Sequence, residues 1–449
     1  MRINVAFIHT MARRQHSKWY KLDNAAKIIP SSARGADTRV FRISCELNDE
    51  VDPEILQTAL DEVIEDFPLF NCILKKGMFW YYLEDSHMTC KVTPDKLPAC
   101  SPLYFPGRKN LLYRVCYFHK RINLEMFHVL ADGTGAFMFF RKLVTRYLIL
   151  AHNLPEEIMD VDVSSQWEKQ GDAFDHFYEK EAGLKQLKSM SKTKAYQIRA
   201  ERDENLLPHL VEGTVSAKKF LKLAHDYETT VGILAVALYI QAVLDGMGRR
   251  FRNRPIAVSV PVNLRQFFKS DTTRNFFGVI NINFDPALYD GTLESIIPVV
   301  KEKFSSQLTE ENIARTMNSY GALEHNVMIK MVPIWIKDIV IDAFNRAAKK
   351  GVTTTISNLG QIKMPAEAAP YIDRFSAFMA APSQQICISS YGDRMVFGEV
   401  SPYVTHQEML NFFRRLIALG VDVEVATNDY DDQSLFHGRE KGNAVLSQV

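Results

Sequence analysis

The sequence predicts an α/β fold of two lobes, each built from a mixed β-sheet with helices. A chain of 449 residues is long enough for about two to four domains. Helix-like and strand-like patterns interleave through both halves of the chain. A polar, charged stretch from about 153 to 208 separates the halves and is too long for a simple loop. We therefore expect lobes at 1–200 and 201–449, with a partly helical linker from about 153 and a frayed tail after about 426.

The composition is that of an ordinary globular protein, with 47% hydrophobic and 24% charged residues. There are 54 Lys and Arg residues against 53 Asp and Glu residues, a net charge of +1. This balance predicts no general attraction to nucleic acid or to an anionic membrane, although it leaves room for a local basic patch. No apolar run reaches about 18 residues, so we expect no membrane span. The six cysteines are scattered without a CxxC pair, which predicts reduced thiols in a cytoplasmic protein.

The N-terminal apolar run is too short for a secretory signal, and Met11 is an alternative start. In the first half, residues 51–68 predict a helix that carries one apolar stripe: Ile55, Leu56, Leu60, Val63 and Ile64. Strands are expected at 79–84 and 90–94, then a hairpin that closes at Arg121, then an amphipathic helix at 133–150.

The second half repeats this alternation of helices and strands. Ser216 is a candidate N-cap for a helix at 216–227, and Thr229 or Thr230 for the apolar helix that follows. Two strands are expected around PVNLR and NFFGVININFD, and helices over much of 292–348. Four short strands follow at TTTISNL, FSAFMAA, QICISSYG and RMVFGEV, and then a last amphipathic helix at HQEMLNFFRRLIALG.

The strongest local signal is FHVLADGTG at 127–135. In the strand before it, Ile122, Leu124 and Met126 are expected to face inward and Arg121, Asn123 and Glu125 outward. The same period of two places His128 on the apolar face. A buried imidazole needs polar partners, and Asp132 and Gly133 follow where the strand turns into a helix. The pattern allows either a general base or a core histidine with satisfied hydrogen bonds.

The segment resembles the HxxxDG signature of the chloramphenicol-acetyltransferase-like superfamily. Other segments resemble its bacterial alcohol-acetyltransferase branch and occur in the expected order: WYKLDNAAKIIP, FRIS, FPLF, GMFWYYLE, KAYQIRA, VPVNLRQFFKSDTTRNFFG and ISNLGQIKMP. The second histidine that usually precedes the catalytic one in condensation domains is replaced here by Phe127. A DFGWG motif is absent, so no residue can be assigned to binding coenzyme A.

The resemblance implies two similar lobes with a tunnel between them and His128 midway along it. It further implies acyl transfer from acyl-CoA or an acyl carrier protein to an alcohol or amine, without a metal or a permanently bound cofactor. His128 would be the general base. Asp132 would be structural and would pair with an arginine of the other lobe, for which we choose Arg265.

We expect an acyl-CoA:alcohol O-acyltransferase that moves an acetyl or other short acyl group and acts as a monomer. Its oxyanion needs a donor, and the candidates are small polar residues in apolar strands: Ser357, Asn358, Asn281 and Asn283. Two alternatives stay open. One is a carrier-protein-dependent condensing enzyme that makes an ester or amide, and the other is a non-catalytic member that only binds a ligand.

Overall fold

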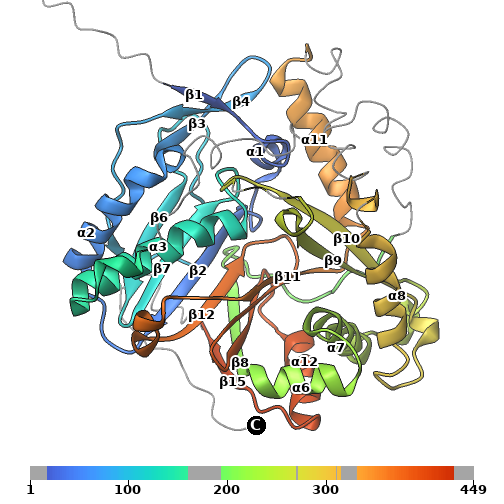
Figure 1. The fold of residues 1–449 in the computed structure, drawn as a ribbon. Coiled ribbons are helices and arrows are strands. Elements are labelled where there is room, and N and C mark those ends of the chain that lie inside the picture. Colours follow the sequence, from blue (N-terminus) through green and yellow to red (C-terminus); the bar gives the residue numbers. More distant parts are fainter. Residues whose placement is uncertain are drawn as a thin grey trace, which may run out of the picture.

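The computed structural model describes residues 18–159, 194–268, 270, 272–309, 311–314 and 331–428. Most of the expected linker and the last residues of the tail lie outside this part of the chain. The described residues form an α/β fold with three sheets (Figure 1). The first sheet has the order β12-β2-β7-β6-β5, the second β10-β9-β11-β13-β14-β8-β15, and a small third sheet β1-β4-β3. Both large sheets are mixed, because β5 runs parallel to β6, and β11 runs parallel to β9 and β13.

The strands of the first and third sheets are β1 (Trp19–Lys21), β2 (Val40–Leu47), β3 (Cys72–Lys76), β4 (Tyr81–Asp85), β5 (Thr93–Pro94), β6 (Tyr113–Phe118), β7 (Arg121–Phe127) and β12 (Ile372–Met379). The strands of the second sheet are β8 (His209–Ser216), β9 (Ile256–Asn263), β10 (Phe277–Phe284), β11 (Thr354–Gln361), β13 (Gln385–Tyr391), β14 (Arg394–Ser401) and β15 (Glu424–Thr427). The α-helices are α1 (Ile29–Ser32), α2 (Pro53–Val63), α3 (Gly133–His152), α6 (Ala217–Asp226), α7 (Val231–Gly246), α8 (Ile297–Gln307), α11 (Ile334–Lys349) and α12 (Gln407–Ala418).

Local signals predicted several of these elements correctly. Ser216 caps α6 by accepting a hydrogen bond from the Lys219 N–H, and Thr230 rather than Thr229 caps α7. The hairpin β6–β7 turns at His119 and Lys120, next to the expected Arg121. β15 pairs with β8 as far as Thr427, and the tail expected to be frayed lies outside the described residues.

The C-terminal half of the chain contributes one strand to the sheet of the N-terminal half. β12 comes from the C-terminal half but pairs antiparallel with β2 at the edge of the first sheet. Residues 362–380 accordingly join the core of the N-terminal lobe. The sheets approach each other closely at Gly398 of β14, where a Cβ atom would lie 2.3 Å from the Ala377 carbonyl oxygen of β12. The domain boundary near 200 stays a prediction, and β12 shows that part of the C-terminal half belongs to the N-terminal lobe.

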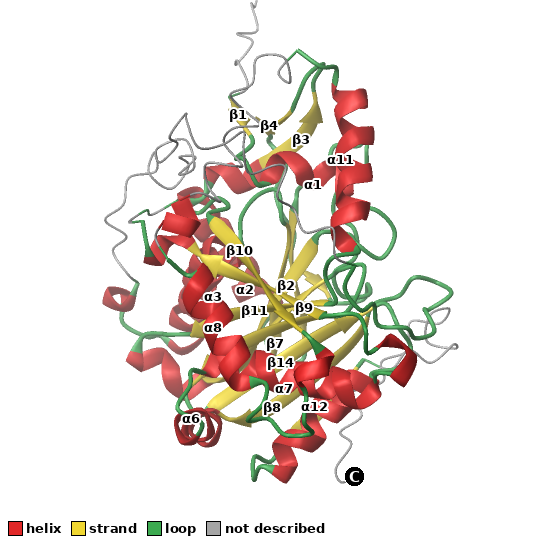
Figure 2. Ribbon diagram, turned by 90° about the vertical axis from the view of Figure 1, so that its right-hand side faces the viewer, coloured by secondary structure: helices red, strands yellow, loops and turns green. Residues whose placement is uncertain are grey.

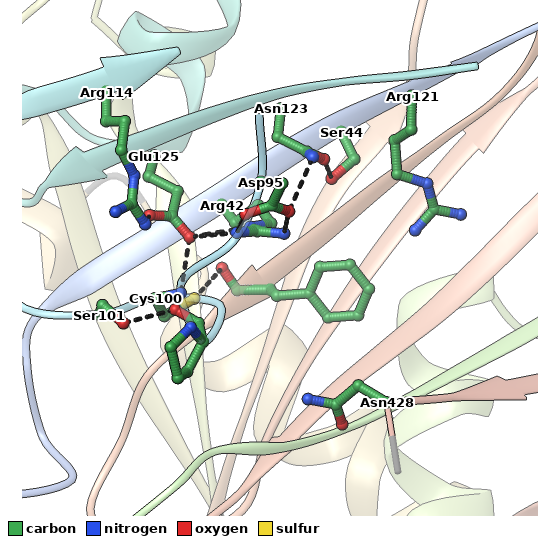
Figure 3. Close-up of polar contacts among 12 residues, drawn as sticks. Arg42, Ser44, Asp95, Cys100, Ser101, Arg114, Arg121, Asn123, Glu125 and Asn428 are labelled. Atoms are coloured by element: carbon green, nitrogen blue, oxygen red, sulfur yellow. Dashed lines mark hydrogen bonds and ion pairs between the residues drawn. The ribbon is translucent and has the colours of Figure 1, made fainter. Parts of the chain in front are cut away.

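The expected outward orientation of Asn123 and Glu125 is wrong, since both side chains are completely buried. Both faces of β7 are covered, so the period of two separates two buried faces rather than core from solvent. Figure 3 shows that Glu125 accepts hydrogen bonds from Arg42, Arg114 and the Cys100 N–H. Asn123 bonds to Asp95 on the same face. Partners of opposite charge make burial of the carboxylate tolerable.

All six cysteines are unpaired and buried. Burial raises the pKa of the Cys116 thiol, which keeps it protonated and unreactive. Among the described residues no single helix is long and apolar enough to cross a membrane, although α6 and α7, bent by 84°, meet the length and composition criteria as a pair.

Candidate active site at the seam of the two lobes

His128 lies directly after β7, in the turn that leads to α3. Its N–H donates to the Arg39 carbonyl oxygen at 2.9 Å, which fixes the backbone where the strand ends. The imidazole is packed between two aromatic rings. Phe41 of β2 meets it edge-on with ring centroids 5.3 Å apart, and Phe277 of β10 lies at 5.6 Å. Because Phe277 comes from the second sheet, His128 sits at the seam of the two lobes and is still partly exposed.

Asn275 of the second lobe holds the imidazole from one side. Its side-chain oxygen lies 2.8 Å from Nδ1 of His128. Its amide nitrogen donates to the His128 carbonyl oxygen and to Asp23, both at 3.0 Å. Asp23 is completely buried and also accepts the Ala26 N–H at 2.7 Å.

These contacts determine which ring nitrogen of His128 carries the proton. The two partners of the Asn275 amide nitrogen are a carbonyl oxygen and a carboxylate, and neither can donate. The amide oxygen must therefore face Nδ1, so Nδ1 is the donor and carries the hydrogen. The lone pair is then on Nε2. Burial lowers the pKa of His128, an effect that outweighs the opposing influence of Asp132 and Asn275. At neutral pH the ring is therefore a neutral base, and no described residue forms a hydrogen bond with its Nε2.

The Asp132 carboxylate forms hydrogen bonds and an ion pair with groups from both lobes. Its carboxylate accepts the Gly135 N–H at 2.8 Å and caps α3. It also accepts the Phe276 N–H of the second lobe at 2.8 Å. Arg265 completes the set with a 2.8 Å ion pair, in which the Arg265 side chain is 10% and the Asp132 side chain 7% exposed. The contact between Asp132 and Arg265 that the resemblance implied is thus present.

Arg265 also shapes the loop that carries Asn275. Its guanidinium group donates to the carbonyl oxygens of Thr272 and Arg274, at 2.9 and 2.6 Å. These bonds curl residues 272–276 around one cation. The Asp132–Arg265 pair therefore supports the position of Asn275, and through it the position of His128.

The packing of the two lobes requires a glycine at position 135 but not at position 133. A Cβ atom on Gly133 would have nothing within 4 Å, and its backbone is not left-handed. A Cβ atom on Gly135 would lie 1.9 Å from the Thr273 carbonyl oxygen. Gly135 thus allows the loop of the second lobe to pack directly on the first turn of α3.

Two of the four candidate oxyanion donors lie well along β10 from the ring that contacts His128. Asn281 and Asn283 are exposed on β10, four and six residues beyond Phe277, which is about 13 and 20 Å along the strand. The structure does not bring these two amides to the imidazole. Asn358 on β11 accepts the Gly360 N–H at 2.8 Å, and Ser357 beside it pairs in register with Cys387. Within the described residues no hydrogen bond joins either side chain to His128, so an oxyanion role for any of the four stays a prediction.

Sequence reasoning missed Asn275 and Asp23, although both lie in segments that carry the resemblance. Asn275 stands in TTRNFFG just before β10, and Asp23 in WYKLDNAAKIIP. Their contact spans 252 residues, and no periodicity reports a pairing over that distance. A separate cavity of about 410 Å³ lies at the start of α7. It is lined by His225, Glu228, Thr229, Thr230, Ile233 and Lys301, and so does not include His128.

No family model matches the chain, and no curated protein matches it either. Solved structures do match. TRI101 of F. sporotrichioides, determined with coenzyme A and T-2, has a TM-score of 0.61 at 11% identity, over 91% of this chain and 100% of that one. Polyketide synthase associated protein 5 from Mycobacterium tuberculosis has a TM-score of 0.58 at 13% identity, over 89% and 97%. The first condensation domain of the CDA synthetase has 0.58 at 12% identity, over 89% and 95%.

These likenesses extend over nearly the whole chain and concern the fold. The chain has the two-lobe fold of the chloramphenicol-acetyltransferase-like superfamily, which acetyltransferases and condensation domains share. The fold expected from the sequence resemblance is confirmed.

Proposed function

We propose that this chain is an acyltransferase that moves an acyl group from acyl-CoA to an alcohol, with His128 as the general base. One observation carries the proposal. The Asn275 amide, oriented by Asp23, keeps the proton on Nδ1 of His128 and leaves the Nε2 lone pair free at the seam between the lobes. A core histidine that served only packing would gain nothing from a free lone pair on a partly exposed ring.

The reaction follows from this tautomer. Nε2 of His128 accepts the proton of the acceptor hydroxyl as its oxygen attacks the thioester carbonyl carbon. The tetrahedral intermediate collapses when the carbon–sulfur bond breaks. The imidazolium then returns its proton to the departing thiolate, so the products are an ester and free coenzyme A thiol. A general base of this kind contributes about 10²–10⁴-fold in rate, and the lowered pKa of His128 keeps it in the basic form at neutral pH.

Asp132 and Arg265 act through position in this scheme. The two side chains pair with each other. The Asp132 carboxylate also accepts the Gly135 and Phe276 N–H groups, and the Arg265 guanidinium group also donates to the loop carbonyl oxygens. Within the described residues, no hydrogen bond joins either side chain to the imidazole. Their part is to keep the loop with Asn275 against the turn with His128.

The choice of acyl-CoA as donor is supported by similar folds that were solved with coenzyme A, among them two TRI101 structures. An alcohol acceptor is supported by TRI3, which is named a trichothecene 15-O-acetyltransferase. A short acyl group follows from the resemblance to alcohol acetyltransferases.

The test is release of free thiol from acetyl-CoA in the presence of a panel of alcohols. The wild type should release thiol with at least one alcohol, and His128→Ala should lose about 10²-fold or more. His225→Ala is the control, because His225 is an exposed histidine on α6 and should keep full activity. Equal activity of His128→Ala and the wild type would remove the proposed base.

Condensation chemistry is the second candidate, favoured by condensation domains of similar TM-score. It predicts no turnover with free acyl-CoA and turnover with the same acyl group loaded on a carrier protein. The mass of the product then distinguishes an ester from an amide.

A further inference from the structure

Helix α11 is amphipathic in the reverse of the usual sense. In a globular protein the apolar side of a surface helix faces the core. Here Trp335, Ile339, Val340 and Phe344 are exposed, with exposed fractions of 60%, 62%, 61% and 49%. The helix lies at the edge of the molecule beside the small sheet β1-β4-β3 (Figures 1 and 2).

The inward side of α11 is held by polar contacts. Asp338 accepts hydrogen bonds from Ser31 at 2.6 Å, Lys76 at 2.8 Å and Tyr81 at 3.2 Å. Lys337 donates to the Phe79 carbonyl oxygen and places its ammonium group 3.4 Å from the centroid of the Trp80 ring. The outward orientation of the apolar side is therefore fixed by specific bonds on the opposite side.

The turn between β3 and β4 extends the apolar surface. The Ile334 N–H donates to the Met78 carbonyl oxygen at 2.9 Å, which joins this turn to the start of α11. Met78 is 73% and Met331 71% exposed, and Phe79 is also exposed. We call the set Met78, Phe79, Met331, Trp335, Ile339, Val340 and Phe344 the α11 surface. Large apolar side chains gathered in this way mark an interaction site.

The surroundings of the α11 surface are basic. The segments that frame it, 18–39, 75–85 and 331–350, hold eleven Lys and Arg residues against six Asp and Glu residues. This is a local excess of five positive charges, one of them the inward Lys337, in a chain whose net charge is +1. The two carboxylates of α11 are both paired with cations, Asp338 with Lys76, and Asp342 with Arg34 and Arg346. Lys350 at the end of the helix is exposed.

We propose that the α11 surface binds the face of an anionic lipid membrane. An exposed row of Trp, Ile, Val and Phe side chains within a basic surround is the pattern of a helix that lies in the membrane interface. The apolar side chains enter the boundary of the acyl chains while the surrounding cations face the anionic headgroups. A second copy of the chain fits less well, because symmetrical contact would bring two basic surrounds together. The proposal is independent of the proposed acyl transfer.

The test is flotation of the full chain with phosphatidylcholine vesicles, with and without phosphatidylglycerol. We expect binding to the vesicles that contain phosphatidylglycerol, and weaker binding at raised salt. The double substitution Trp335→Ser and Ile339→Ser should weaken binding about tenfold or more. Lys350→Glu should weaken it about tenfold while leaving the apolar side chains intact.

The matched control is Leu221→Ser with Leu288→Ser, which removes two leucines of similar exposure, 59% and 55%, outside the α11 surface. It should bind vesicles like the wild type. Circular dichroism and thermal melting of each variant show whether the fold is intact. The proposal is overturned if the wild type binds neither kind of vesicle, or if the control and the α11 variant bind equally. It is also overturned if the wild type instead forms a dimer that the α11 variant abolishes.

Discussion

Asp132 and Arg265 come from different lobes and form a buried ion pair with a 2.8 Å separation between the carboxylate oxygen and the guanidinium nitrogen. Each member of the pair also forms hydrogen bonds within its own lobe. Asp132 caps α3, and Arg265 holds the carbonyl groups of residues 272–276. The turn with His128 and the loop with Asn275 are thereby fixed to a common pair, so the geometry of the site and the docking of the lobes depend on the same contact.

The first prediction concerns the energy of this pair. Asp132→Asn and Arg265→Gln should each lower the free energy of unfolding by about 3–5 kcal/mol, because each leaves a buried charge without its partner. The double variant should lose less than the sum, with a coupling of about 1–3 kcal/mol. Urea unfolding of the four proteins measures this cycle. The exposed pair Lys219 and Asp422 is the control and should show a coupling below about 1 kcal/mol.

Exchange of the two charges, Asp132→Arg with Arg265→Asp, should not restore stability. An arginine at 132 cannot accept the N–H groups of Gly135 and Phe276, which the aspartate now satisfies. Full recovery in the exchanged protein would mean that the pair acts through charge alone.

The second prediction concerns Asn275 as a positioning residue. Asn275→Ala removes the acceptor of the Nδ1 proton, so the two tautomers of His128 become closer in energy and kcat should fall about tenfold or more. The hydrogen bond from His128 to Asn275 raises the pKa of the imidazole against the larger lowering by burial. Its loss should move the acidic limb of the kcat/KM profile to lower pH. A limb that stays in place while kcat falls would indicate a purely structural role.

The pH dependence of kcat/KM in the wild type also follows from the burial of His128. Because burial lowers the pKa of His128, kcat/KM should rise with pH through a value below about 6.5 and then level off. A limb above that value would contradict the surroundings seen for this ring.

The third prediction separates two glycines of the motif. Gly135→Ala would bring a Cβ atom to 1.9 Å from the Thr273 carbonyl oxygen, so the loop or α3 must shift. We expect a loss of about 3 kcal/mol or more in the free energy of unfolding, together with loss of activity. Gly133→Ala meets nothing within 4 Å and should change stability by less than about 1 kcal/mol. Thermal melting of both variants decides, and equal destabilisation would contradict the close approach at Gly135.

The sequence predicted what depends on neighbouring residues. The stripe of α2, the N-caps Ser216 and Thr230 and the β6–β7 hairpin all follow from side chains a few positions apart. The Asp132–Arg265 contact is a different case, because it was reached through the resemblance to a family and not through a local pattern.

The features that sequence reasoning missed depend on distant segments. The alternation in β7 predicts that Glu125 faces outward, because it does not show that Arg42 and the chain around Cys100 cover this side chain. β12 reads as another strand of the second half, and nothing in its own residues reveals that it pairs with β2. Asn275 becomes part of the site only because the lobes dock.

The last prediction concerns acid stability at a second contact between the lobes. Glu212 of β8 is buried. Its carboxylate oxygens form ion pairs with guanidinium nitrogens of Arg121 in β7, at 3.2 Å, and of Arg374 in β12, at 3.1 Å. Burial alone would raise the pKa of this carboxyl group, but the two arginines outweigh it and lower the pKa. Since the unfolded value is about 4.3, the stabilisation is complete above that pH and is lost as the pH falls through the lower folded value.

Glu212→Gln should therefore lower the free energy of unfolding by about 3 kcal/mol at neutral pH. The difference from the wild type should shrink as the pH falls below about 4, because the wild-type carboxylate is then protonated as well. Urea unfolding at a series of pH values measures both effects. Glu62→Gln is the control, since its partner Arg146 lies at the surface side of α3 and Glu62 is 46% exposed, so the loss should stay below about 1 kcal/mol. A difference between Glu212→Gln and the wild type that stays constant down to about pH 3 would show that the interlobe arginines do not lower the pKa of Glu212.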